Sequence, residues 1–261
     1  MYRAFNLNRI SFKSDYKSEL ITRYNQKHQN ICKEIKKNIE DFILSNHDLN
    51  GAALQDAFFP TNFYPDVFIS HSHDDEEFAK AFAQYLEDNF QIKSFIDSTV
   101  WGGFKELKDS LDIYFMRKKG NCYSRDEQYR VISHVHLMLN TALMQMIDRC
   151  EAFFLLNTPQ SISVDDIIGA STYSPWIFSE IGMYHLIEKR KTIRQIQESI
   201  NFDSGIKQKL DLTDFTVLYV DDINKWREIY EKQKNSLFMN GKEALDVLYE
   251  MKPLKNNIKY S

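Results

Sequence analysis

The sequence predicts an α/β fold, in which helices flank a parallel β-sheet. Two observations lead to this fold class: short apolar segments rich in β-forming residues recur along the chain, and stretches with helical apolar spacing separate them. Strands that alternate with helices form parallel sheets, because a helix must carry the chain back to the start of the next strand. A ligand is then expected at the carboxyl ends of the strands. The predicted strands are residues 66–70, 94–97, 152–157 and 215–219.

The N-terminal part of the chain is expected to form a helical extension. Residues 13–47 contain neither Gly nor Pro, and apolar residues such as Leu20 and Tyr24 recur at helical spacing, which predicts one long helix. Pro60 and Pro65 then favour an extended chain and a domain boundary. The predicted parts are an N-terminal helical extension, an α/β domain, and a C-terminal helix with a tail, at residues 1–61, 62–235 and 236–261.

Further helices are expected within and after the α/β domain. Gly102 and Gly103 are expected to break the chain after the second strand. Ser174 and Pro175 open a helix, with Ser as N-cap and Pro at the first helical position. A fifth strand is hard to locate after Tyr219. The remaining predicted helices are residues 75–89, 126–149, 223–234 and 242–251.

Composition argues against several classes of function. The 33 Lys and Arg residues stand against 37 Asp and Glu residues, so no overall field favours nucleic acid or a membrane surface as a partner. The 8 glycines include no G-x-G spacing, which removes both the dinucleotide fingerprint and the P-loop. The 3 cysteines form no C-x-x-C pair and indicate a reducing compartment. The N-terminal pattern does not fit a secretory signal, and the longest apolar run, residues 152–156, is too short for a membrane span, so we expect a cytoplasmic location.

A first polar cluster follows the strand at residues 66–70. The H-x-H-x-D spacing of His71, His73 and Asp75 is similar to the first ligand set of metallo-β-lactamase-like hydrolases. Those enzymes place a histidine directly after the aspartate, where this chain has Glu76. A polar turn that caps a helix is therefore preferred and no metal is expected, but a metal-dependent hydrolase stays open as an alternative.

A second cluster lies where the helix at Ser174 begins. Trp176 and Glu180 are four residues apart, so both project from one face of that helix. Taken alone the pair is weak evidence, because a glutamate near a helix N-terminus commonly serves only the helix dipole and a tryptophan there is commonly part of the core.

Several of these pieces, taken in order, resemble a TIR (Toll/interleukin-1 receptor) domain. They are the strand D-V-F-I-S-H-S at residues 66–72, the acidic turn into a helix, the strand ending at Asp97 and the W-x-x-x-E pair. The helix segment 133–139 is similar to bacterial TIR-like proteins in particular, and the resemblance spans about residues 64–219. It implies a flavodoxin-like parallel sheet, and either NAD⁺ glycohydrolysis or protein scaffolding. The long helix at 126–149 departs from the family.

The resemblance also implies roles for individual residues. Glu180 matches the catalytic glutamate and Trp176 its accompanying tryptophan. Ser70 and His71 match the turn that borders the nucleotide cleft. The expected substrate-binding residues are completed by a flexible gating loop at residues 97–104, which contains Asp97 and Trp101.

One carboxylate is sufficient for such a reaction. Nicotinamide leaves NAD⁺ as a neutral molecule, so no general acid is needed, and a carboxylate beside the developing ribosyl cation lowers the barrier. The resemblance thus implies NAD⁺ as a substrate, with no separate cofactor. The product is linear or cyclic ADP-ribose, or a base-exchanged dinucleotide. A role in bacterial anti-phage defence, a separate effector protein and self-association through the TIR domain or the N-terminal helix are expected, and a non-catalytic TIR scaffold is the alternative.

Overall fold

A computed structural model describes residues 1–33, 39–44, 48–58, 64–96, 98–165, 169–187, 211–234 and 241–254. Its centre is a five-stranded, all-parallel sheet with the strand order β3-β2-β4-β1-β7. A small two-stranded antiparallel sheet, formed by β5 (Ser163–Asp165) and β6 (Gly169–Ser171), lies outside that sheet. The predicted α/β class is thus confirmed. The strands of the main sheet are β1 (Arg3–Asn8), β2 (Val67–Ser70), β3 (Ser94–Ile96), β4 (Ala152–Asn157) and β7 (Phe215–Leu218).

Strand β1 is the main departure from the expected organisation. It pairs with β4 on one side and with β7 on the other, so the N-terminal segment supplies an inner strand of the sheet. The expected boundary between residues 61 and 62 therefore does not separate the sheet from an extension. Counted from β2, the other strands follow the flavodoxin-like order 2-1-3-4-5, and β1 fills the fourth place. This is the strand that could not be located after Tyr219.

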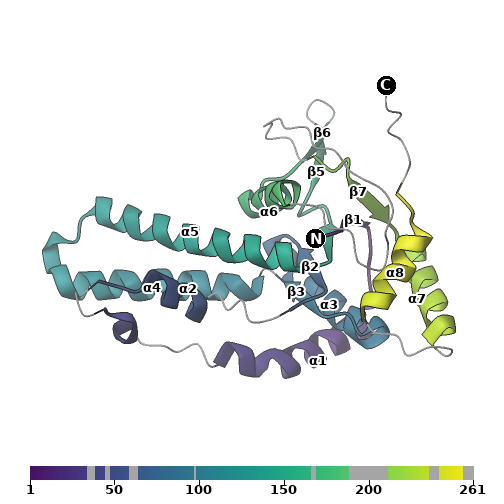
Figure 1. The fold of residues 1–261 in the computed structure, drawn as a ribbon, viewed down its shortest axis with the longest axis horizontal. Helices are drawn as coiled ribbons and strands as arrows, with labels where there is room; N and C mark the ends of the chain where they lie inside the picture. The colour runs from purple at the N-terminus through teal and green to yellow at the C-terminus, as the bar shows by residue number, and fades with distance from the viewer. Residues whose placement is uncertain are drawn as a thin grey trace.

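Helices cover both faces of the sheet (Figure 1). Side chains alternate along each strand, so each strand feeds two cores: Phe68 and Phe153 face one layer of helices, and Phe5 and Phe154 face the other. The first layer, here called the α6 face, contains α2 (Gly51–Phe58), α4 (Ser98–Lys119), α5 (Arg125–Arg149) and α6 (Pro175–Leu186). The second, the α3 face, contains α1 (Ser14–Lys33), α3 (Glu76–Phe90), α7 (Val220–Lys234) and α8 (Gly241–Met251).

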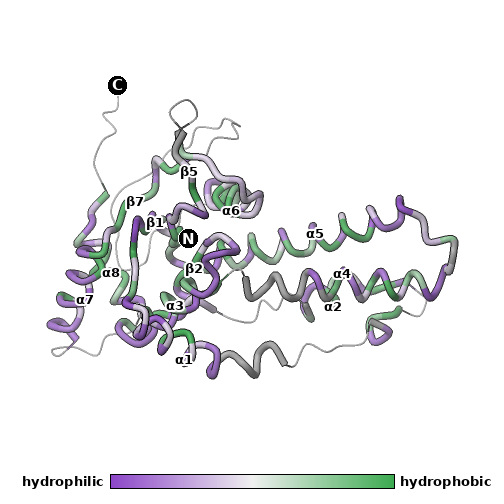
Figure 2. The backbone as a smooth tube through the Cα atoms, turned by 180° about the vertical axis from the view of Figure 1, so that it is seen from behind, coloured by the Kyte–Doolittle hydropathy of each residue, from purple (hydrophilic) through white to green (hydrophobic). Residues whose placement is uncertain are grey.

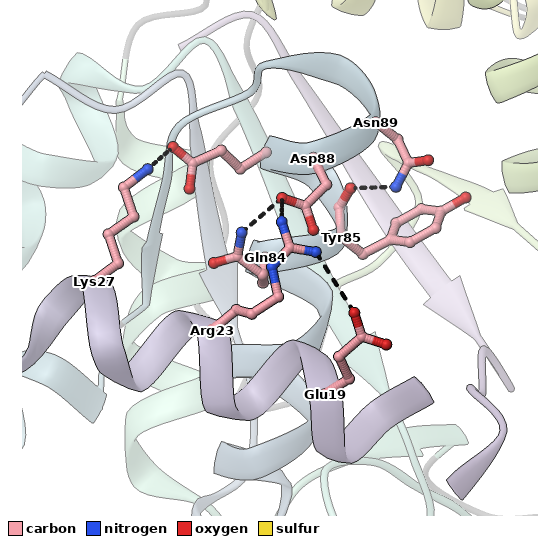
Figure 3. Close-up of polar contacts among 8 residues, drawn as sticks. Glu19, Arg23, Lys27, Gln84, Tyr85, Asp88 and Asn89 are labelled. Carbon is pink, nitrogen blue, oxygen red and sulfur yellow. Dashed lines mark hydrogen bonds and ion pairs between the residues drawn. The ribbon is translucent and has the colours of Figure 1, made fainter. Parts of the chain in front are cut away.

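Helix α1 packs against its own domain. Leu20 is fully buried in the core of the α3 face, and Arg23 forms an ion pair with Asp88 of α3 at 2.8 Å. Lys27, which lies one turn further along α1 (Figure 3), pairs with Glu87 of α3. The prediction of one helix over residues 13–47 is wrong in its extent, because described residues in that range form a short 3-10 helix, Ile39–Phe42, and a β-bridge at Ile43.

Helices α4 and α5 run side by side and project well beyond the sheet (Figure 1). Hydrophobic and hydrophilic residues alternate along α5, as expected for a helix with one packed side (Figure 2). Ser124 and Glu127 form a reciprocal capping box that starts α5. Gly102 and Gly103 do not break the chain as expected, because both lie within α4. No helix within the described ranges is both long and apolar enough to cross a membrane.

The C-terminal helices complete the α3 face. Trp226 of α7 stacks on Phe90 with ring centroids 3.9 Å apart, and its Nε1 donates to the carbonyl of Ala244 in α8 at 2.8 Å. Leu245 and Leu248 of α8 are fully buried. Helix α8 therefore belongs to the core of the α/β unit, although the sequence placed it beyond the boundary at residue 235.

Candidate functional site

A polar strip lies at the carboxyl edge of the sheet, on the α6 face. Ser70, the last residue of β2, pairs with Leu155 of β4, which pairs in turn with Asn6 of β1. One pleat further, Asn157 of β4 pairs with Asn8 of β1. All of these side chains point to the same face, because they are an even number of residues from Phe68, Phe153 and Ala4, which belong to the core of the α6 face.

Glu180 of α6 contacts this strip at Ser70. Its Oε2 accepts a hydrogen bond from the Ser70 hydroxyl at 2.6 Å, and both side chains are 0% exposed. A carboxylate that is removed from water requires protein hydrogen-bond donors in place of the water, and Ser70 supplies one. We call Ser70, Glu180, Asn6, Asn8 and Asn157 the polar edge.

Local sequence explains why α6 is positioned in this way. Ser174 caps the helix by accepting a hydrogen bond from the Ile177 amide, and Pro175 occupies the first helical position, as predicted. Ile177 and Ile181 are buried in the core of the α6 face. Glu180 lies between them in sequence and is carried to the sheet with this apolar side of the helix.

The turn after β2 is tied to the chain after β4 through Asp75. Its Oδ2 accepts hydrogen bonds from the Ser72 and Thr158 hydroxyls, each at 2.5 Å. The Thr158 amide donates to Ser161 Oγ at 2.8 Å, and Ser161 Oγ donates to the Leu156 carbonyl at 2.7 Å. The carboxyl ends of two neighbouring strands are therefore held together by side chains.

The same network continues to the start of α6. The Thr172 hydroxyl donates to the Ser161 carbonyl at 2.7 Å, and the Ser174 amide donates to Thr172 Oγ1 at 3.1 Å. Ser174 is the N-cap of α6. A continuous chain of hydrogen bonds thus runs from the turn that follows Ser70 to the helix that carries Glu180.

The arrangement does not assemble the suspected metal ligands. His71 is buried, His73 is exposed, and Asp75 is engaged by the two hydroxyl groups. Within the described parts of the chain, no group of three or more His, Cys, Asp or Glu side chains could hold a metal ion. Burial also raises the pKa of the Cys150 thiol, so this cysteine is not poised as a thiolate nucleophile.

The structure gives Trp176 an aromatic neighbour and forms most of the expected gating loop as helix. The Trp176 ring is half-buried and stacks on His136 of α5, with ring centroids 5.6 Å apart. From Ser98 onward the expected loop is part of α4, so the prediction of a loop over residues 97–104 is wrong. Asp97 lies outside the described residues, and Trp101 lies in α4 with its side chain outside the description.

A hollow of about 510 Å³ lies on the opposite side of the sheet, between α1 and α3. Its charged groups already pair across the interface: Lys27 pairs with Glu87, and Arg23 pairs with Asp88 as Figure 3 shows. It therefore lacks a free charge for a ligand and is separate from the polar edge.

The comparisons with known proteins do not assign this arrangement. No protein-family model matches the chain, and no curated protein or solved structure matches it either.

The sequence analysis missed the contribution of β1 to the polar edge. Asn6 and Asn8 went unnoticed because the segment Arg3–Asn8 was not recognised as a strand. A signal was present: apolar Phe5 and Leu7 alternate with Asn6 and Asn8, the period-2 pattern of a strand.

Proposed function

We propose that the chain is a TIR-type enzyme that cleaves the bond between nicotinamide and ribose in NAD⁺. The observation that carries the proposal is the buried pair of Glu180 and Ser70 at the carboxyl edge of a parallel sheet. Ligands of open α/β sheets bind at that edge, and these two residues come from the two segments that carry the TIR resemblance. The flavodoxin-like strand order, apart from the inserted β1, supports the same reading.

The proposed reaction needs little from the protein besides electrostatics and orientation. The electron pair of the C–N bond passes to the pyridine nitrogen, so nicotinamide leaves neutral and C1′ of the ribose becomes cationic. The Glu180 carboxylate stabilises this cation, most strongly in a site without water. Attack by water at C1′ releases a proton and gives ADP-ribose, whereas attack by an adenine nitrogen of the same molecule gives a cyclic product.

The burial of Glu180 bears on regulation. Glu180 and Ser70 are fully buried, so a substrate reaches the carboxylate only when the covering chain moves. We propose that self-association of the α/β unit in the cytoplasm triggers this opening, and that the product acts as a signal for a separate effector in anti-phage defence. Leu20 and Tyr24 of α1 are buried within the same chain, so they are not free to bind a second copy.

The test is NAD⁺ consumption with product identification by mass spectrometry, at high protein concentration and with a crowding agent. Wild-type protein is compared with Glu180→Gln, which keeps the side-chain volume and removes the charge. We expect turnover by the wild type and a loss of at least about 100-fold in the variant, the scale found for removal of one electrostatic group. Unfolding midpoints of both proteins serve as the control, and equal turnover by the two folded proteins would contradict the role of Glu180.

A non-catalytic scaffold is the second candidate, and one observation favours it. A carboxylate that is 0% exposed and bonded to Ser70 can also serve to fix α6 to β2. If the chain is a scaffold, no condition that promotes self-association produces NAD⁺ turnover. Glu180→Gln then alters only stability or partner binding. The metal-dependent hydrolase is not proposed, since His71 is buried and His73 is exposed.

A further inference from the structure

Asn6 is a buried polar residue on the inner strand β1 that the proposed mechanism does not use. It is 7% exposed, and within the described residues its Oδ1 has no hydrogen-bond partner. A buried amide oxygen without a donor destabilises the fold, so such a group calls for an explanation. A ligand that brings its own N–H group would supply the missing donor.

Asn6 lies in the same row of the sheet as Ser70. Both pair with Leu155, one from each side, and both side chains point to the α6 face. Neighbouring strands are about 4.8 Å apart, so the two Cα atoms are roughly 10 Å apart across β4. Glu180, which is hydrogen-bonded to Ser70, marks the ribose end of that span in the proposed reaction.

We propose that Asn6 binds the carboxamide of the leaving nicotinamide, an inference that rests on the proposed NAD⁺ cleavage. The carboxamide is carried by C3 of the pyridine ring, meta to the N1 atom that bears the ribose, so in our proposal the ring extends from Ser70 and Glu180 and turns its carboxamide toward Asn6. The carboxamide NH₂ donates to Asn6 Oδ1. The amide of Asn6 accordingly selects a carboxamide over a carboxylate at this position, because a carboxylate has no proton to donate and would place a negative charge against the amide oxygen.

The substrate pair that isolates this contact is NAD⁺ and nicotinic acid adenine dinucleotide, which differ only at the carboxamide. We expect wild-type kcat/KM to favour NAD⁺ by at least about 100-fold, as a site built around a hydrogen bond rejects the analogue that lacks it. In Asn6→Leu the ratio falls toward 1, mainly through a higher KM for NAD⁺. The unfolding midpoint of this variant is expected to rise or stay unchanged, because an unsatisfied buried amide is replaced by an apolar group of similar size. Asn6→Val serves as a second variant if leucine does not fit.

Gln84→Leu is the matched control. Gln84 is also buried, at 5% exposed, and its Oε1 likewise has no hydrogen-bond partner among the described residues, but it lies on the α3 face. Its substitution is expected to leave the preference for NAD⁺ unchanged. A preference that survives in folded Asn6→Leu, or that disappears equally in Gln84→Leu, would overturn the role of Asn6 while leaving NAD⁺ cleavage intact.

Calorimetric binding of both dinucleotides, in the Glu180→Gln protein with and without Asn6→Leu, separates the two proposals. Tight binding that depends on Asn6 supports the contact even if the wild type turns nothing over, in which case only the proposed enzymatic function fails. Binding of both dinucleotides with equal affinity overturns the contact. No binding of either dinucleotide to any variant overturns both proposals.

Discussion

Polar residues at the sheet edge are buried or half-buried, and each polar group that is removed from water needs a replacement for it. Ser70 donates to Glu180, and Ser72 and Thr158 donate to Asp75. Removing one partner leaves a buried acceptor without its donor. The loss of one of these bonds therefore costs more free energy of unfolding than its formation contributes. The polar edge is therefore sensitive to small changes that barely alter volume.

Ser70→Ala tests this sensitivity. The variant removes the hydroxyl that donates to Glu180, and we expect the free energy of unfolding to fall by about 1–3 kcal/mol. The measurement is urea unfolding of Ser70→Ala, Glu180→Gln and the double variant, which we expect to be non-additive by about 0.5–3 kcal/mol because the residues are in contact. Ser18→Ala, at an exposed position of α1 where the hydroxyl donates to the Ser14 carbonyl, is the control and should change stability by less than about 0.5 kcal/mol. Strict additivity would show that the hydroxyl and the carboxylate are not coupled.

At this scale the sequence identified only part of the site. Ser70 and Glu180 were named as candidates through the TIR resemblance, which rests on local patterns: a strand that ends in polar residues and a capped helix with a W-x-x-x-E pair. Asn6 could not be named in this way, because its place beside Leu155 arises from strand pairing between distant parts of the chain. His71 and His73 are close in sequence, yet one is buried and the other exposed, which residue spacing alone does not reveal.

Among the helices and strands too, those whose bounds depend on neighbouring residues were predicted, and those that depend on contacts between distant parts of the chain were not. The bounds of β4 and the cap of α6 follow from a continuous apolar run and from Ser174-Pro175, and both were predicted. The glycines within α4 were misread, since packing of α4 against α5 outweighs their poor helix propensity. Strand β1 was missed because Asn6 and Asn8 make it polar on one side.

Two glycines in helices give opposite predictions at this scale. At Gly241, the first residue of α8, a Cβ would lie 2.6 Å from the Gln91 carbonyl oxygen and 3.0 Å from Asp66 Oδ2. We expect Gly241→Ala to lower the free energy of unfolding by about 1–3 kcal/mol, because backbone must shift to admit the methyl group. At Gly182 in α6 a Cβ would meet no atom within 4 Å, so Gly182→Ala should stabilise the protein by about 0.5–1 kcal/mol. Denaturant unfolding measures both changes. If the two substitutions change the free energy of unfolding in the same direction, the close approach of α8 to the turn after α3 is contradicted.

For the whole molecule, the position of β1 determines whether the α/β domain can fold without the N-terminal segment. A division at residue 61 predicts that the α/β domain survives loss of the preceding chain. The structure predicts the reverse, because removal of β1 leaves β4 and β7 facing a gap in the sheet and exposes the side chains that packed on Phe5 and Leu7.

Deletion of residues 1–12 tests this dependence. We expect the shortened chain to be insoluble or to lose cooperative thermal unfolding, as monitored by circular dichroism. Addition of a synthetic peptide of residues 1–12 during refolding should restore part of the transition, since β1 is held by pairing with β4 and β7 rather than by its neighbours in sequence. Cooperative unfolding of the shortened chain near the midpoint of the full chain would show that β1 is dispensable.

The inner position of β1 also sets the order of events during synthesis. A ribosome produces residues 3–8 early, but their pairing partners are residues 152–157 and 215–218. Segment 3–8 stays unpaired until residues 152–157 and 215–218 have emerged. Strands β2 and β3, in contrast, can pair soon after they are synthesised. Closure of the sheet is therefore a late step with a high loop-closure entropy, and the nascent chain carries an exposed Phe5 and Leu7 until then.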